Sequence, residues 1–188
     1  MVRQRSAKPL FGGSIPPVAS ITFLMKQALL IVDVQNFFIN KWTQSIPQKI
    51  VRLIEANNFP NIVFSKFVNT PESQFVRLFN FTECSKPPYT DIVNDLRPWV
   101  KEDNVFTKKT FSVFANPEFD DYLKRYKIEE LVIAGLDLEY CVLADAFNAF
   151  DKGYKVKLAA DCCSSYTFGD RFKAEILAIA KKSIAEII

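Results

Sequence analysis

The chain has 188 residues, of which 49% are hydrophobic, and a formal net charge of +3 at pH 7. This length and composition predict one soluble globular domain, and the charge is too small and too scattered to indicate a nucleic-acid partner. No apolar run approaches the roughly 20 residues that span a bilayer, so no membrane partner is expected. Four cysteines, two of them adjacent at Cys162 and Cys163, are not a disulfide framework and predict a reducing, cytoplasmic location.

The chain contains no histidine. That absence excludes Ser–His and Cys–His nucleophile pairs and any zinc site with histidine ligands. The sequence also has no C-x-x-C pair and no glycine-rich phosphate loop, which excludes thioredoxin-type redox chemistry and the common nucleotide-binding loops. A general base in this protein would therefore be a carboxylate, a lysine or a tyrosine. We predict neither a metal nor another cofactor.

Residues 1–24 contain basic residues, no acidic residue, and paired glycines and prolines. This composition does not predict a packed element. A transit peptide and an upstream start or added leader both fit it. Met25 would be a natural start because the first predicted strand follows almost directly. We therefore assign residues 25–188 to a single domain.

The first predicted strand covers residues 28–34, a run that is apolar on both faces, as in a buried parallel strand. Asp33 interrupts it near its carboxyl end, where sites form in open α/β sheets. A buried carboxylate is costly unless it is paired, and a capping or turn aspartate is the plainer alternative. We favour a site role because Gln35 and Asn36 continue the polar run. A helix is predicted next, over residues 46–55.

The second predicted strand covers residues 61–68. From 69 to 98 the sequence then loses its periodicity and becomes aromatic. A loop this long in a compact domain is usually functional, so we expect a substrate lid or pocket wall; a segment that only covers the core is the alternative. A short strand is predicted at 104–107. The pair Lys108 and Lys109 follows it, and such a pair alone is most typical of a solvated turn.

The rest of the chain alternates in the same way. Predicted elements are a helix at 117–126, a strand at 131–136, a helix at 141–151, a strand at 155–160 that Asp161 ends, and a helix at 171–181. Residues 184–188 form either a last strand or a frayed end. This alternation predicts a three-layer α/β/α fold with a mostly parallel, Rossmann-like central sheet of about five or six strands.

The most informative stretch is 131–153, an apolar run that breaks at Gly135 and continues as a helix from about Cys141. The helix is indicated by apolar residues spaced i, i+4, i+7 and i+8, which are Val142, Ala146, Ala149 and Phe150. In the first turn of such a helix, backbone N–H groups and the helix dipole favour a thiolate and can hold an oxyanion. An inert buried cysteine is the commoner fate, and position alone does not decide between the two.

Three segments, ALLIVDVQNFF, KKTFSVFANPEFDDYL and LVIAGLDLEYCVLADAFNAFDKGYKV, together resemble the isochorismatase-like cysteine hydrolase family. The resemblance runs from about Met25 to the C-terminus and depends on the order D-x-Q, Lys before S-x-F, and Y-C-V before D-x-G-Y. It implies that the family's Asp–Lys–Cys triad falls on Asp33, Lys108 and Cys141. It also implies a non-proline cis peptide between Leu136 and Asp137.

The implied reaction is hydrolysis of an amide or related C–N bond of a small molecule through a thioester on Cys141, without a cofactor. Asp33 would take the thiol proton, Lys108 would hold Asp33 and stabilise the thiolate, and the backbone N–H groups of Asp137 and Cys141 would receive the oxyanion. A homo-oligomer is expected from the family. Aromatic residues at such spacings are more often part of a core. We nevertheless assign the substrate pocket to a mostly aromatic set: Gln35, Phe37, Phe38, Trp42, Phe111 and Tyr140.

Three residues depart from the family pattern. Asp137 and Leu138 replace small or hydroxylated residues, and Asp145 replaces a common threonine. An added carboxylate would repel an anionic substrate or raise the pKa of Cys141. Nicotinamidase-like members hold a metal through histidines and isochorismatase proper lacks the cysteine, so metal dependence, nicotinamide specificity and vinyl ether cleavage are not expected. A catalytically weak or inactive binding or assembly protein and a redox-sensing thiol protein stay as alternatives.

Overall fold

The computed structural model describes residues 26–188, and the predicted leader at 1–24 lies outside the described residues. Within them, parallel strands form a six-stranded sheet in the order β3-β2-β1-β4-β5-β6. The strands are β1 (Gln27–Val32), β2 (Asn61–Phe67), β3 (Val105–Lys108), β4 (Glu130–Gly135), β5 (Lys155–Cys163) and β6 (Glu186–Ile187). The predicted α/β class with a parallel, Rossmann-like sheet is confirmed.

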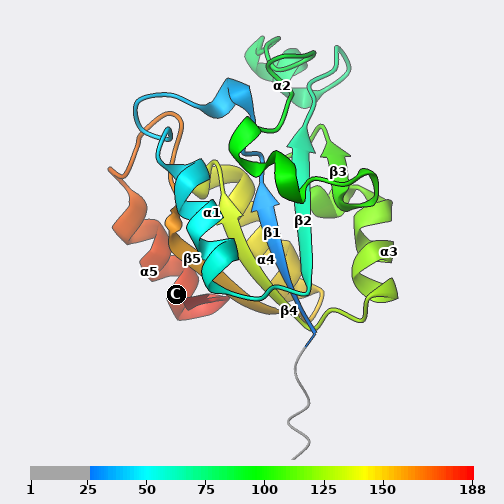
Figure 1. Cartoon of the computed structure of the whole chain (residues 1–188). Coiled ribbons are helices and arrows are strands. Elements are labelled where there is room, and N and C mark those ends of the chain that lie inside the picture. The colour runs from blue at the N-terminus through cyan, green and yellow to red at the C-terminus, as the bar shows by residue number, and fades with distance from the viewer. Residues whose placement is uncertain (1–25) are drawn as a thin grey trace, which may run out of the picture.

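Helices cover both faces of the sheet. The α-helices are α1 (Ile46–Ala56), α2 (Gln74–Phe79), α3 (Pro117–Arg125), α4 (Leu143–Asp151) and α5 (Lys173–Ser183). Short 3-10 helices are η1 (Asn36–Phe38), η2 (Asn94–Trp99), η3 (Glu102–Asn104) and η4 (Val113–Ala115), and η5 (Leu138–Val142) is a π-helix. Figure 1 shows α1 in front of the sheet and α4 behind it. No helix in residues 26–188 is both long and apolar enough to cross a membrane.

Strand β1 explains why the core has two halves. Successive side chains of a strand point to opposite faces. Leu30 and Val32 accordingly pack with residues of α3, α4 and α5. Leu29 and Ile31 pack on the other face with residues of α1 and η2. Because both faces are covered, β1 has no polar side of the kind that a half-exposed strand shows.

The order of the strands fixes where a site can form. The chain runs outward from β1 through β2 to β3, and then crosses to β4 on the other side of β1. Ligands bind at such a topological switch point, outside the carboxyl ends of the strands. Figure 1 shows α2 and its neighbouring loops beyond these carboxyl ends. Gly135 lets β1 and β4 approach closely there, because a Cβ on it would lie 2.2 Å from the carbonyl oxygen of Val32.

Several predicted boundaries are wrong. Strand β5 does not end at Asp161 but continues to Cys163, because the pairing with β4 shifts register and the Asp161 side chain stays exposed. The helical segment begins at Leu138, three residues before Cys141. The aromatic stretch at 69–98 is not all irregular, since it contains α2 and most of η2. At the C-terminus, β6 pairs with β5, which resolves the choice between a strand and a frayed end.

Candidate active site

Asp33 lies directly after β1 and is buried, with 1% of its surface exposed. Its φ of 50° is in the left-handed region, which non-glycine residues rarely adopt. Ser65 of β2 holds it from two sides. The hydroxyl of Ser65 donates to Asp33 Oδ1 at 2.7 Å and accepts from the Asp33 backbone N–H at 3.2 Å. The carboxylate is therefore fixed at the carboxyl end of β1, with Oδ2 left for another partner.

That partner is Lys108, the last residue of β3. Its Nζ lies 2.7 Å from Asp33 Oδ2, and neither side chain is exposed by more than 1%. The same ammonium donates to the backbone carbonyl of Phe111. Burial, the largest single effect, would lower the pKa of Lys108, but the charge of Asp33, its hydrogen bond and smaller contributions such as the charge of Asp145 together outweigh burial and raise it. The lysine is therefore a permanent cation, and the two residues form a buried ion pair.

Cys141 lies in η5, beside this ion pair. Burial is the largest cause that raises the pKa of its thiol well above the ordinary value, and the charge of the Asp33 carboxylate acts in the same direction. The charge of Lys108 acts in the opposite direction without cancelling the rise. The helix start therefore does not leave a thiolate, and at neutral pH the sulfur is a neutral thiol. The charge of Asp145 also raises the pKa of Cys141, as expected for an added carboxylate.

The peptide bond between Leu136 and Asp137 is cis, at the position that the family resemblance implies. It lies where β4 gives way to η5. Within residues 26–188 no backbone carbonyl accepts from the N–H of Asp137, whereas its carbonyl accepts from the N–H of Val142 at 3.1 Å. The assignment of the Asp137 and Cys141 N–H groups to an oxyanion stays a prediction.

The side chain of Asp137 is also part of the site. Its Oδ1 accepts from the backbone N–H of Tyr166 at 2.6 Å. Burial raises the pKa of this carboxyl to about 7, with the nearby charges of Glu139 and Asp33 acting in the same direction. Near neutral pH the group therefore exists as a mixture of carboxylic acid and carboxylate.

A cavity of about 480 Å³ opens above the thiol of Cys141. Nine aromatic side chains form most of its lining: Phe37, Phe38, Phe67, Phe75, Phe79, Phe81, Phe111, Tyr140 and Tyr166. Asp137, Cys141 and Thr167 complete it. The predicted lid at 69–98 contributes three of the aromatic residues, from α2 and the segment after it.

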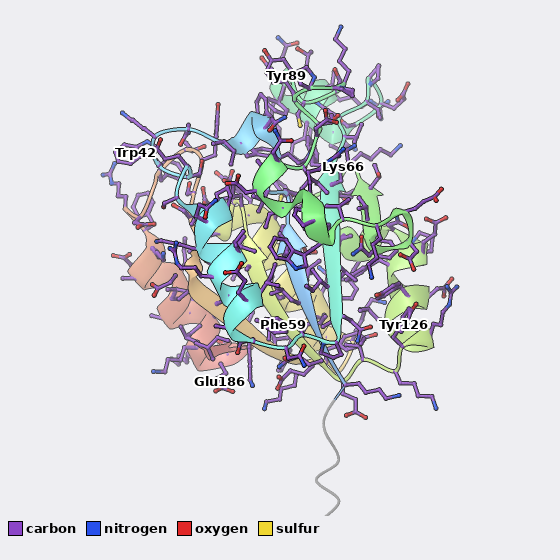
Figure 2. The ribbon with its side chains drawn as sticks, viewed as in Figure 1. Trp42, Phe59, Lys66, Tyr89, Tyr126 and Glu186 are labelled. Carbon is purple, nitrogen blue, oxygen red and sulfur yellow. The ribbon has the colours of Figure 1, made fainter. Side chains whose placement is uncertain are left out.

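Four of the six predicted pocket residues line this cavity, and two do not. Gln35 is fully buried and holds backbone groups instead: its amide donates to the carbonyl of Phe67 at 2.8 Å and accepts from the N–H of Phe67 at 2.7 Å. Trp42 is 50% exposed and lies at the surface (Figure 2). Its ring packs against Gly169. Both assignments to the pocket are therefore wrong.

Sequence reasoning missed three lining residues, Phe67, Tyr166 and Thr167. A usable signal was present. Phe67 is the last residue of β2, and Tyr166 follows the carboxyl end of β5 by three residues. Residues at these positions face the same rim of a parallel sheet as Asp33 does.

Asp145, in the first turns of α4, supports the segment that holds Lys108. Its Oδ1 accepts from the hydroxyl of Ser112 at 2.8 Å and from the N–H of Val113 at 2.7 Å. These residues directly follow Phe111, whose carbonyl accepts from Lys108. Asp145 Oδ2 is buried without a hydrogen-bond partner in the described residues, and burial raises the pKa of the carboxyl to about 7.

The other three cysteines are buried away from the cavity. Burial raises the pKa of Cys84 and of Cys163 to about 12, and it also raises the pKa of Cys162. Among residues 26–188, Cys141 is the cysteine whose side chain a small molecule in the cavity would meet. No group of three or more Cys, Asp or Glu residues in this part of the chain is arranged to hold a metal ion.

Comparison with known proteins places these features in a family. The isochorismatase domain model matches residues 27–188. Isochorismatase domain-containing protein 2 of Xenopus laevis is 34% identical over 70 residues, which is 37% of this chain and 34% of that protein. The structure is similar to nicotinamidase PncA from Bacillus subtilis, with a TM-score of 0.76 and 25% identity over 87% of this chain and 99% of that one. It is also similar to N-carbamoylsarcosine amidase from Thermoplasma acidophilum, with a TM-score of 0.74 and 21% identity over 87% and 95% of the two chains.

Proposed function

The chain belongs to the isochorismatase family, and from this premise we propose that it is a cysteine hydrolase that cleaves an amide or related C–N bond of a small molecule. One observation carries the proposal. Cys141 lines the cavity, and the buried Asp33–Lys108 ion pair is close enough to act on the pKa of its thiol, which supports a base, a cation and a nucleophile in one site. In a chain without histidine, this is the combination that nucleophilic catalysis needs.

The first step uses the neutral thiol. As Sγ of Cys141 forms a bond to the substrate carbonyl carbon, the thiol proton passes to the carboxylate of Asp33. The raised pKa of Cys141 suits this order of events, because the proton leaves only while the new bond forms, and a more basic sulfur is the stronger nucleophile. Lys108, which loses its charged partner when Asp33 is protonated, then stabilises the negative charge that appears in the transition state.

The second step releases the amine. The negative oxygen of the tetrahedral intermediate is assigned to the backbone N–H groups of Asp137 and Cys141. When the intermediate collapses, Asp33 returns its proton to the leaving nitrogen, which departs as ammonia or an amine and leaves a thioester on Cys141. A water molecule, deprotonated by Asp33, then cleaves the thioester to a carboxylic acid and restores the thiol.

The size and lining of the cavity support a small-molecule substrate. Pockets for small ligands measure roughly 300–1,000 Å³ and are mostly apolar with a few polar groups. The cavity over Cys141, at about 480 Å³ and with mainly aromatic walls, falls in that range. Two similar structures are named as amidases, of nicotinamide and of N-carbamoylsarcosine, and this supports C–N bond cleavage as the reaction class.

A redox-sensing role is less well supported than hydrolysis. Oxidation and disulfide exchange proceed from the thiolate, and sensor cysteines have a low pKa. The pKa of Cys141 is instead raised, as are those of the other three cysteines. We therefore do not propose that function. A binding protein without turnover is separated from an enzyme by experiment.

The test compares the wild-type protein with Cys141→Ala on a panel of primary amides and carbamates, with released ammonia as the readout. The variant is expected to lose at least about 10⁴-fold in kcat/KM, because the nucleophile itself is removed, and to keep the wild-type melting temperature. Cys162→Ala, which removes a buried thiol away from the cavity, is the matched control and should keep full activity. Retained hydrolysis by Cys141→Ala would refute nucleophilic catalysis.

A further inference from the structure

The cavity over Cys141 combines aromatic walls with a single ionisable carboxyl group. Among residues 26–188, Asp137 is the one acidic side chain of its lining, and no lysine or arginine contributes to it. Lys108 is close by but has no exposed side-chain surface, and its ammonium is already bound to Asp33 and to the carbonyl of Phe111. The cavity therefore offers no cation to a negatively charged substrate, and it does offer an anion to a positively charged one.

Only one of the two oxygens of the Asp137 carboxyl group accepts a hydrogen bond from the described residues. Oδ1 accepts from the backbone N–H of Tyr166, and no described residue donates to Oδ2. Asp137 also lies at the start of the turn that carries Cys141, and both residues line the same cavity. A cation bound to Asp137 would consequently share the cavity with the amide that the sulfur attacks.

The electrostatic surroundings favour a cation at this point. Burial raises the pKa of Asp137, and the negative charges of Glu139 and Asp33 raise it further, whereas the positive charge of Lys108 lowers it. The net result is a pKa raised to about 7. Ionised Asp137 is thus under-compensated when the cavity is empty, and a bound cation would supply the missing positive charge. Aromatic rings add to the attraction, since a cation over a ring face gains roughly 0.5–2 kcal/mol.

We propose that this cavity selects amides that carry an ammonium group next to the scissile bond, with Asp137 as the counter-ion and the aromatic walls around the ammonium. The inference rests on the proposed function, because it names the substrate class of the same site. It also explains why an acidic residue stands in a position where the family resemblance leads one to expect a small or hydroxylated one. Amides with a carboxylate or phosphate in that place are excluded by the same arrangement.

A purely structural role for Asp137 can be separated from this one. Holding the Tyr166 backbone requires only the acceptor Oδ1. Asparagine keeps that acceptor and removes the charge, so Asp137→Asn leaves the structural role and abolishes the counter-ion. The matched control is Asp121→Asn on α3, which makes the same change in net charge at an exposed position outside the cavity.

The experiment uses two amides of the same shape. Betaine amide carries a trimethylammonium group next to its primary amide, and 3,3-dimethylbutanamide has a carbon atom in place of the charged nitrogen. The wild-type protein and Asp121→Asn are expected to prefer the cationic amide about tenfold or more in kcat/KM, equivalent to about 1.4 kcal/mol. Asp137→Asn should reduce this ratio to about one.

Binding to the Cys141→Ala variant makes the inference testable apart from catalysis. Calorimetric titration of that variant with both amides should show the same preference, and the added Asp137→Asn change should remove it. Equal affinity for the two amides, a preference that survives Asp137→Asn, or no binding of betaine amide at millimolar concentration would each overturn the inference. A binding preference without any hydrolysis by the wild-type protein would instead overturn the proposed function and leave the inference standing.

Discussion

Buried carboxylates lie at both ends of the parallel sheet, and the two ends treat them differently. At the amino end, Glu130 opens β4 and is 3% exposed. Its two oxygens lie 3.0 Å from Nζ of Lys155 and 3.1 Å from Nζ of Lys157, and the amide of Gln27 also donates to it. At the carboxyl end, Oδ2 of Asp145 has no partner in the described residues.

The pKa values follow these partners. Burial alone would raise the pKa of Glu130, but the hydrogen bonds from its lysine and glutamine partners outweigh burial and lower it. Burial dominates for Asp137 and Asp145, and both pKa values rise to about 7. Of the buried carboxylates described at the carboxyl end, only Asp33 is fully paired, through Lys108 and Ser65. Asp137 in the cavity lining and Asp145 in α4 stay under-paired, and such carboxyl groups with raised pKa values are typical of a functional site.

The largest effect is expected from Lys108→Met. The change leaves the Asp33 charge buried and unpaired, which should lower the free energy of unfolding by about 3–5 kcal/mol and reduce hydrolysis about 10³-fold or more. Urea denaturation and an ammonia-release assay measure the two effects.

The double variant Asp33→Asn/Lys108→Met is the control for that result. Asparagine fits the left-handed φ of 50° at position 33 and can still bond Ser65, so most of the lost stability should return while activity stays low. A double variant as unstable as Lys108→Met alone would show that the ion pair is not the cause of the loss.

The next effect concerns the under-paired carboxyl of Asp145. Its pKa in the folded protein, about 7, lies above its ordinary value of 3.8, so the folded state holds the proton more tightly than the unfolded state does. The stability contributed by this group is full below the unfolded pKa and is lost as the pH rises through about 7. Asp145→Asn should therefore gain about 2 kcal/mol over the wild-type protein between pH 5.5 and pH 8.5, measured by denaturation at both values. Asp121→Asn should show no such gain, and a pH-independent difference for Asp145→Asn would contradict the assignment.

Much of this site could be predicted because it depends on local sequence. Asp33 interrupts an apolar strand, Lys108 ends one and Cys141 follows one, and the carboxyl ends of parallel strands meet at one rim. The family resemblance then implies that the three residues form one catalytic triad. The alternation of elements likewise predicted the parallel sheet, because buried strands and amphipathic helices have different periods.

What sequence could not predict depends on long-range partners. For Cys141 the sequence predicts two opposite effects on the pKa, a decrease from the helix start and an increase from an added carboxylate. The pKa rises mainly because tertiary packing buries the thiol near Asp33. Gln35 looked like a ligand-binding amide, but its hydrogen bonds go to the backbone of Phe67 on another strand. The continuation of β5 through Asp161 depends on a register shift against β4, which no local pattern records.

At the fully paired end of the sheet, Glu130→Gln should have a moderate effect on stability alone. The loss of charge-assisted bonds from Lys155 and Lys157 should lower the free energy of unfolding by about 2 kcal/mol at pH 7 and leave hydrolysis unchanged. Because the folded pKa of Glu130 is lowered, its contribution is present above about 4.5 and is lost as the pH falls below that value. The difference between the two proteins should therefore shrink in acid, and a loss of hydrolysis in Glu130→Gln would contradict the division between the two ends.

The smallest effect sharpens the contrast at the cavity itself. Betaine amide does not titrate, and the ionised form of Asp137 is the one that attracts it, so its affinity for Cys141→Ala should rise with pH through the pKa of about 7. Between pH 6 and pH 8 the expected gain is about tenfold by calorimetry. The other charged groups that act on Asp137 are Glu139, Asp33 and Lys108. The pKa of Lys108 is raised above its ordinary value, so Lys108 does not change its charge between pH 6 and pH 8. Two controls should show an affinity that does not depend on pH: the neutral amide with Cys141→Ala, and betaine amide with Cys141→Ala/Asp137→Asn. If the affinity in either control rose with pH in the same way, another group would be the one that titrates, and Asp137 would not be the counter-ion.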